Sequence, residues 1–367
     1  DSLVVLQVFG NDSSSIRRGT VITAINDIPS AVFIDQMRQY AYSDGFSDGF
    51  RDIQISTSFP ARFRWMYDLS KNYRVCFLDS LGNPAEEVLT NYVPPKRDTL
   101  RPRQADTVTT MASRPPQPRR RPSYGSFKLD STLPAAFLEL NNFSHRKVPK
   151  LIRTSFRQMR QTRTPDLVID LRANGGGKID YSTLLTRYVI DKPFRVADSA
   201  SAKDLRLAYP EHIQAAWVYR YFRWTFTSRQ ADGRWHMQRT ERKVYKPKRK
   251  NHFNGTLYVL TGGATFSASS LFLSKVHHQA NVVTVGEETG GGARGNNAIM
   301  TPKITLPNTR VQLRLPLFRL ISDASIPDIG RGIMPKVPVD PDSWYIRQGV
   351  DKKMEKVKEL IGKRRQP

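Results

Sequence analysis

The sequence predicts a mixed α/β protein, and two patterns in its central part carry that prediction. In the first, the apolar, β-branched run Thr256–Leu260 leads through a glycine turn into apolar residues at helical spacing from Ser267, and a second apolar run follows at Val282–Val285. Strand, helix and strand in this order form a crossover unit, which favours a parallel sheet. The second pattern repeats this order of elements; it comprises Ala135–Leu140, Val148–Arg160 and Leu167–Leu171.

The composition is that of an ordinary globular protein except for its charge. Of 367 residues, 39% are hydrophobic and 25% are charged, but 58 Lys and Arg against 33 Asp and Glu give a net charge of +25. Such an excess attracts polyanions or an anionic surface, without indicating which. The single cysteine, Cys76, excludes an internal disulfide and a cysteine-based zinc cluster. No run of 18 apolar residues occurs, so we expect no integral membrane segment.

Residues 1–92 form one compositional block, with strands predicted at Leu3–Phe9 and Tyr73–Leu78 and a helix at Val32–Tyr40. Because the chain starts directly in a strand, we expect a trimmed protein that lacks its own beginning. The segment Arg17–Ser30, RRGTVITAINDIPS, resembles the signature of PDZ domains, with Thr20 and Asp27 in place of its Asp and Gly. The block is therefore predicted to be a PDZ-like, β-rich domain.

The repeat DGFSDGF at Asp44–Phe50 lacks the alternating carboxylates and closing Glu of an EF-hand calcium loop, so it predicts turns. Residues 93–124 are rich in Pro and Arg without apolar periodicity, which predicts a linker. Residues 125–340 form the α/β core, and 341–367 are predicted to carry a C-terminal surface helix. Within the core, residues 195–254 are long, basic and aromatic, and indicate an insertion that either stacks nucleotides or forms an amphipathic helix with a solvated loop.

Ser267 lies where the strand Thr256–Leu260 passes into a helix, so its hydroxyl lies near the positive end of the helix dipole. Two interpretations remain open. The serine is either a helix cap or a nucleophile whose oxyanion hole includes the next amide, that of Ala268. Two glycine motifs do not indicate phosphate binding. Gly290–Gly295 matches the G-x-G-x-x-G pattern of dinucleotide-binding loops, but a strand-like run follows it where that motif needs a helix. Gly175–Lys178 lacks the Ser or Thr of a Walker loop.

Three segments together carry a family resemblance: DLRANGGG at Asp170–Gly177, TGGATFSAS at Thr261–Ser269 and VGEETGG at Val285–Gly291. In this order and spacing they resemble the C-terminal (tail-specific) processing peptidases, serine peptidases with many Bacteroidetes-type members. The resemblance covers roughly residues 130–340. It implies a crotonase/ClpP-like catalytic core with an N-terminal PDZ-like domain, a polypeptide substrate, no cofactor or metal, and a periplasmic, cell-surface or secreted location.

The resemblance also implies roles for individual residues. Ser267 is the expected nucleophile and Ser269 the second serine of the motif. The oxyanion hole is expected from the amides of Ala268 and of Gly176 or Gly175. The residues expected to support the loops are Asp170, Arg172, Glu287 and Asp328.

The general base is where this chain departs from the family. Gly292 aligns with the lysine that bacterial members use as the base. Tricorn-like relatives use a histidine and a glutamate instead, and this chain has only His145 and Asp328 near the corresponding positions. The candidates that remain are His145 and Lys178, whereas His277 and His278 fall about 15 Å along the helix from Ser267. Either Glu287 or Glu288 can orient a base, and the chain can also lack one.

The expected function is therefore that of a serine peptidase acting on extended polypeptides by acyl transfer through Ser267. One alternative is a catalytically inactive relative that binds peptide or an apolar ligand, which the missing lysine supports. A second is a polyanion-binding protein, which the net charge and the Arg/Pro-rich linker favour.

Overall fold

The computed structural model describes residues 2–8, 14–67, 69–90, 124–130, 132–207 and 209–365, and these ranges divide into two compact units. Unit 1 holds residues 1–40, 58–122 and 341–351, and unit 2 holds residues 41–57, 123–340 and 352–367. The predicted linker 93–124 lies outside the described residues except for Tyr124. Over the described ranges, no helix is both long and apolar enough to cross a bilayer.

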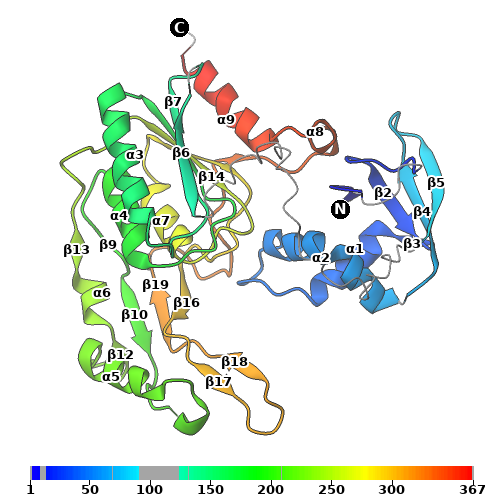
Figure 1. Cartoon of the computed structure of the whole chain (residues 1–367). Helices are drawn as coiled ribbons and strands as arrows, with labels where there is room; N and C mark the ends of the chain where they lie inside the picture. The colour runs from blue at the N-terminus through cyan, green and yellow to red at the C-terminus, as the bar shows by residue number, and fades with distance from the viewer. Residues whose placement is uncertain are drawn as a thin grey trace, which may run out of the picture. The chain divides into compact units, whose positions relative to one another are not determined.

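Unit 1 is a small antiparallel sheet covered by helices (Figure 1). Its strand order is β1 (Leu3–Val4), β2 (Val21–Ile25), β4 (Asn72–Leu78) and β5 (Pro84–Thr90), with β3 (Ile28–Pro29) paired to β2. Phe33 and Met37 of α1 (Ser30–Gln39) are fully buried, and Phe63 meets the Phe33 ring edge-on with centroids 5.5 Å apart. The β-rich character of this unit agrees with the prediction, although its first strand ends at Val4.

Helix α2 (Gly49–Tyr67) was not anticipated by the sequence analysis. Its sequence holds a Ser-Thr-Ser run and Pro60, both of which indicate a break. The helix does bend there: Ser58 has φ −130° and ψ 18°. Residues 49–57 belong to unit 2 and residues 58–67 to unit 1.

Unit 2 is built on the predicted parallel sheet. Its strand order is β20 (Val337–Pro338), β15 (Val282–Gly286), β14 (Thr256–Thr261), β8 (Asp166–Asp170), β7 (Ala135–Leu140) and β6 (Gly125–Leu129), and only β6 runs antiparallel to its neighbour. Helices α3 (Val148–Thr162), α4 (Ile179–Val189) and α7 (Ala268–Val276) pack on one face. Helix α9 (Lys352–Lys363) covers the other (Figure 1). The predicted α/β core with a β-rich N-terminal unit is confirmed.

The C-terminal segment is more than a surface helix. It forms α8 (Ser343–Gln348) and α9, and Val357 and Ile361 of α9 are fully buried against Phe137, Tyr258 and other residues of the sheet. Helix α9 therefore completes the core on a sheet face that would otherwise stay uncovered.

Residues 195–254 contribute three strands to a second sheet, in which they join two strands from later in the chain. Its order is β11 (Ser228–Arg229), β12 (Trp235–His236), β10 (Ser199–Ala202), β19 (Phe318–Ile321) and β16 (Gly295–Ile299). Helices α5 (Ala216–Phe226) and α6 (Gln238–Arg242) flank it, together with the pair β9 (Phe194–Arg195) and β13 (Val244–Tyr245). The hairpin of β17 (Lys303–Thr305) and β18 (Gln312–Arg314) extends beside it (Figure 1). We call this part of unit 2 the arm.

Candidate active site

The three glycine-containing loops follow neighbouring parallel strands and meet at their carboxyl edge. Strand β8 pairs with β14 and β14 with β15, so the loops after Asp170, Thr261 and Gly286 leave the sheet side by side. Hydrogen bonds join them: Thr265 Oγ1 donates to Leu171 O at 2.9 Å, and Gly291 N donates to Thr265 O at 3.0 Å. Ligands bind at this edge in open parallel sheets.

Ser267 has a strained backbone at the start of α7. Its φ of 52° and ψ of −115° lie outside the regions that non-glycine residues favour. Although serine commonly caps helices, its side chain makes no capping hydrogen bond here, and the residue is only partly buried. A strained serine on a strand-to-helix turn is the geometry of a nucleophile elbow. Ser267 thus occupies the N-cap position of α7 without using its hydroxyl as the cap, and its role as a nucleophile stays a prediction.

Gly176 of the first loop packs directly against Ser267. A Cβ at Gly176, where φ is 101°, would lie 2.7 Å from Ser267 Cβ and 3.0 Å from Ala268 N. A side chain would also be strained at that φ. Only glycine allows the first loop to lie this close to the serine turn.

Asn174 holds these two loops together, and the sequence analysis did not single it out. It is fully buried; its Nδ2 donates to Leu140 O and its Oδ1 accepts from Gly176 N, both at 2.9 Å. Its backbone oxygen accepts from Phe266 N at 3.1 Å and from Ser269 Oγ at 3.0 Å. The only sequence signal is its place inside DLRANGGG.

The amides predicted for an oxyanion hole differ in their hydrogen bonding. Ala268 is the first residue of α7, where a backbone N–H has no partner within the helix. The Gly176 N–H is already donated to Asn174. Gly175 is exposed, with no atom within 4 Å of where its Cβ would be. Ser269 is fully buried and its hydroxyl binds the Asn174 backbone, so it supports the loop.

His145 lies near the glycine loop but makes no hydrogen bond to Ser267 in the described part of the chain. Its segment is fixed by Phe143, whose N–H donates to Gly176 O at 2.8 Å. The imidazole stacks on Tyr124, with centroids 4.5 Å apart, and its Nδ1 accepts from Lys147 N at 3.2 Å. A neutral ring bonded in this way carries its proton on Nε2.

Lys178 and His277 also make no hydrogen bond to Ser267 in the described ranges. Lys178 is exposed, with its ammonium 5.3 Å from the ring centroid of Tyr181. His277 caps the far end of α7, where burial and then the neighbouring His278 lower the pKa of His277 to about 4. Neither brings a proton acceptor to Ser267.

The carboxylates predicted to support the site are all paired with cations. Asp170 binds Arg172 at 2.6 Å, which closes the turn after β8. Glu287 binds Lys353 of α9 at 3.1 Å. The remaining pairs are Glu288 with Arg331 at 2.6 Å and Asp328 with Arg319.

Gly292 and Asp328 line one cavity of about 120 Å³, together with Asp44, Arg294 and Arg331. Gly292 N donates to Asp44 Oδ2 at 3.2 Å. The repeat Asp44–Phe50, predicted to form turns, therefore reaches the third loop, and its last two residues begin α2, with Gly49 beside Gly263 of the second loop.

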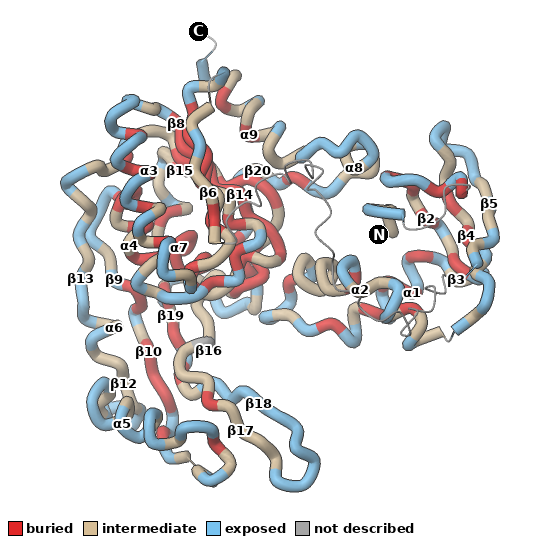
Figure 2. The backbone as a smooth tube through the Cα atoms, viewed as in Figure 1, coloured by how far each residue is buried: buried red, intermediate tan, exposed pale blue. Residues whose placement is uncertain are grey.

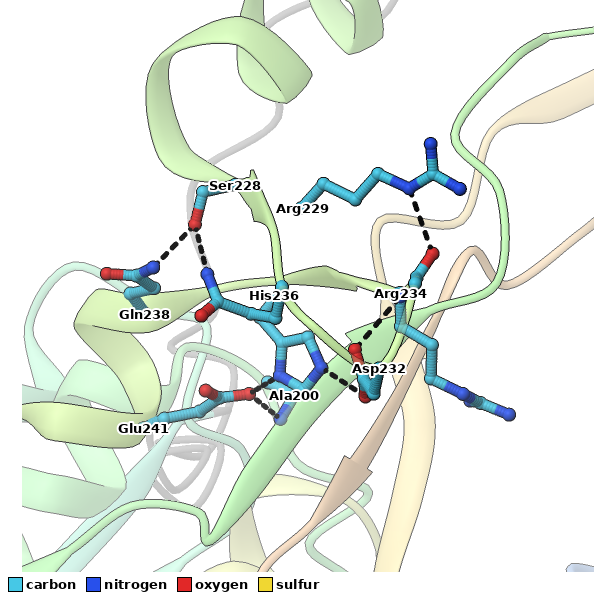
Figure 3. Close-up of polar contacts among 10 residues, drawn as sticks. Ala200, Ser228, Arg229, Asp232, Arg234, His236, Gln238 and Glu241 are labelled. Atoms are coloured by element: carbon cyan, nitrogen blue, oxygen red, sulfur yellow. Dashed lines mark hydrogen bonds and ion pairs between the residues drawn. The ribbon is translucent and has the colours of Figure 1, made fainter.

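A second histidine cluster lies in the arm (Figure 3). His236 Nδ1 contacts Glu241 Oε1 at 2.8 Å, and its Nε2 contacts Asp232 Oδ2 at 3.0 Å. Ser228 is turned away: its hydroxyl accepts from Gln230 and Gln238. Because both nitrogens face carboxylates, the ring has no free position for a nucleophile, and the cluster is structural.

A strained serine where a strand of a parallel sheet passes into a helix is an arrangement that serine hydrolases share. More specifically, the sequence model of Peptidase family S41 matches residues 134–339, more than half of the chain, and the chain belongs to this family. The predicted resemblance is thereby confirmed. The PDZ-like nature of unit 1 stays a prediction.

Solved structures agree on the fold. Mature CPAF complexed with lactacystin is 14% identical with a TM-score of 0.62, over 98% of this chain and 80% of that chain. Mature CPAF alone is 15% identical with a TM-score of 0.61, and the match covers 98% of this chain and 79% of that chain. A Parabacteroides merdae structure is 17% identical with a TM-score of 0.47; the match covers 65% of this chain and spans 64% of the other. No curated protein matches the chain.

Proposed function

We propose that the chain is a serine endopeptidase that cleaves extended polypeptides by acyl transfer through Ser267. The observation that carries this proposal is the backbone of Ser267, strained, free of a capping bond and packed against Gly176. The family implies a polypeptide substrate. A periplasmic or cell-surface location is proposed on the family resemblance alone.

In the proposed reaction, Ser267 Oγ attacks the scissile carbonyl carbon while its proton passes to a base. The oxyanion accepts hydrogen bonds from Ala268 N–H and a glycine amide. Gly175 is favoured as that glycine because Asn174 already engages Gly176 N–H. The C–N bond then breaks, the proton goes to the leaving amine, and water hydrolyses the acyl-enzyme.

His145 is the base that we propose, because Phe143 holds its segment against the glycine loop. To accept a proton from Ser267 through Nε2, the ring must first give up its bond to Lys147 N and carry its proton on Nδ1. His145→Ala is expected to lower the labelling rate of Ser267 by at least a hundredfold, in the range of general-base contributions. Lys178→Ala is expected to change it little.

The test is labelling of the full chain with a fluorophosphonate probe. Wild type is expected to label and Ser267→Ala to lose all labelling. Ser274→Ala is the matched control, since the Ser274 hydroxyl donates to Leu271 O within the same helix. Labelling that persists in Ser267→Ala, or a folded wild type that does not label, contradicts the proposal.

One observation favours a second candidate, a non-catalytic peptide binder. In the described ranges, Ser267 Oγ has no hydrogen bond to a titratable side chain. The predicted alignment of Gly292 with the lysine of bacterial members would agree with this. A binder would show no labelling, yet would bind an unfolded polypeptide equally well as wild type and as Ser267→Ala.

A further inference from the structure

Helix α5 of the arm presents large aromatic side chains to solvent. None of its residues is buried, and Trp217 and Trp224 are 72% and 88% exposed. Tyr221 lies between them at helical spacing, so the three rings share one face. The opposite face carries Phe222, whose ring meets Phe318 of β19 edge-on at 6.3 Å. The helix is therefore attached to the arm by one aromatic face, while the other is uncovered.

The neighbouring hairpin carries a second uncovered apolar row. Val311, Leu313 and Leu315 alternate along and beside β18, so they share one face of the strand, and each is about half exposed. The hairpin is joined to the segment before α5, since Gln214 N donates to Lys303 O at 3.0 Å. Figure 2 shows both elements exposed at the same end of unit 2.

The arm is strongly basic. Residues 199–250 contain thirteen Lys and Arg against four Asp and Glu. A recess of about 460 Å³ lies beside α5, lined by Arg206, Arg220 and Arg223 together with Tyr221 and Trp224. Guanidinium groups in such a recess suit phosphate oxygens, to which arginine binds with two parallel hydrogen bonds.

We propose that the outer face of α5 and the apolar row of β18 dock on the surface of an anionic phospholipid bilayer. The aromatic rings would lie at the level of the headgroups, the aliphatic row among the first acyl carbons, and the arginines of the recess on lipid phosphates. The proposal is independent of the activity proposed for Ser267.

The charge and the side-chain types select this occupant. A second copy of the chain would bring one basic arm against another, which like charges oppose. Single-stranded nucleic acid would use the rings and the arginines, but the aliphatic row Val311, Leu313 and Leu315 offers nothing to stacked bases. A bilayer with anionic headgroups can contact the aromatic rings, the arginines and the aliphatic row together.

The test is co-sedimentation of the full chain with vesicles of phosphatidylcholine, with and without 30% phosphatidylglycerol. We expect binding only to the anionic vesicles, and release by salt. Trp217→Ser with Trp224→Ser should weaken the partition about tenfold. Arg206→Gln and Arg220→Gln should weaken it about fivefold each. Trp344→Ser, at a 59% exposed tryptophan of α8, is the matched control and should bind like wild type.

Thermal unfolding verifies that each variant is folded. Equal binding to neutral vesicles, or anionic binding that the α5 variants do not change, overturns the proposal. A protein that does not bind vesicles overturns the proposal too, if it is instead retained on single-stranded DNA or dimerises at rising concentration. In either case the replacement of Trp217 and Trp224 would have to weaken that interaction.

Discussion

Replacing Asn174 by alanine tests whether the active-site geometry depends on a buried amide. The change removes the bonds from Nδ2 to Leu140 O and from Gly176 N to Oδ1, so two buried backbone groups lose the partner that Asn174 supplies. With each such loss costing about 1–2 kcal/mol, the free energy of unfolding should fall by about 2–4 kcal/mol. For a unit of this size that corresponds to a Tm lowered by roughly 5–15 °C.

The functional effect should exceed what stability alone explains. Without Asn174, the Gly176 loop is no longer fixed against the Ser267 turn, so the amides that face an oxyanion lose their alignment. We expect the rate constant of fluorophosphonate labelling, measured well below either Tm, to fall about 100-fold, the size of one lost oxyanion donor.

Asn281→Ala is the control for this experiment. Its Nδ2 donates to Gly255 O at 3.0 Å, at the amino end of β14, away from the loops. Asn281→Ala should lower the free energy of unfolding by about 1 kcal/mol and leave the labelling rate unchanged. An Asn174→Ala protein that labels at the wild-type rate despite a lowered Tm refutes the positioning role.

Three further predictions follow from single positions. Gly176→Ala should abolish labelling and lower Tm, because its Cβ would lie 2.7 Å from Ser267 Cβ, while Gly175→Ala should leave Tm unchanged; equal effects contradict this. Burial lowers the pKa of His236, but hydrogen bonds to its two carboxylates outweigh it and the pKa is raised. The difference in unfolding free energy between wild type and His236→Gln should thus be largest below about pH 6.5 and decline as the pH rises through the raised pKa of His236. A difference that calorimetry finds constant with pH contradicts this. His277, with a pKa of about 4, binds its proton more readily unfolded, so stability should fall from about pH 6.5 towards pH 4, and less so in His277→Gln.

The parallel sheet and the position of Ser267 could be predicted because each depends on local patterns. The strands Ala135–Leu140 and Val282–Gly286 are nearly continuous apolar runs, and the structure places them within one residue of the expected bounds. A strand that enters a helix through a Gly-containing turn fixes where Ser267 lies. What the pattern could not give is its φ of 52°, which depends on how the loop closes.

The base could not be predicted because it depends on distances between loops. His145 was singled out by its place after a strand, but its hydrogen bond to Lys147 and its stacking on Tyr124 have no signature in the sequence. Likewise, either Glu287 or Glu288 was expected to orient a base, and the ion pair of Glu287 with Lys353, a residue of a helix expected only on the surface, has no signature in the sequence.

The repeat Asp44–Phe50 has a part in the fold that its sequence does not indicate. Its first DGF triplet forms the predicted turn, whereas the second enters α2, and the ring of Phe50 packs on Phe266 with centroids 4.7 Å apart. A Cβ at Gly263 would lie 2.3 Å from the Gly49 backbone. Glycines at both positions let two backbones touch four residues before Ser267, although the two glycines are more than 200 residues apart in the sequence. Each loop of the site therefore requires glycine where another segment lies against it, and the segments that impose this requirement can be identified only from the fold.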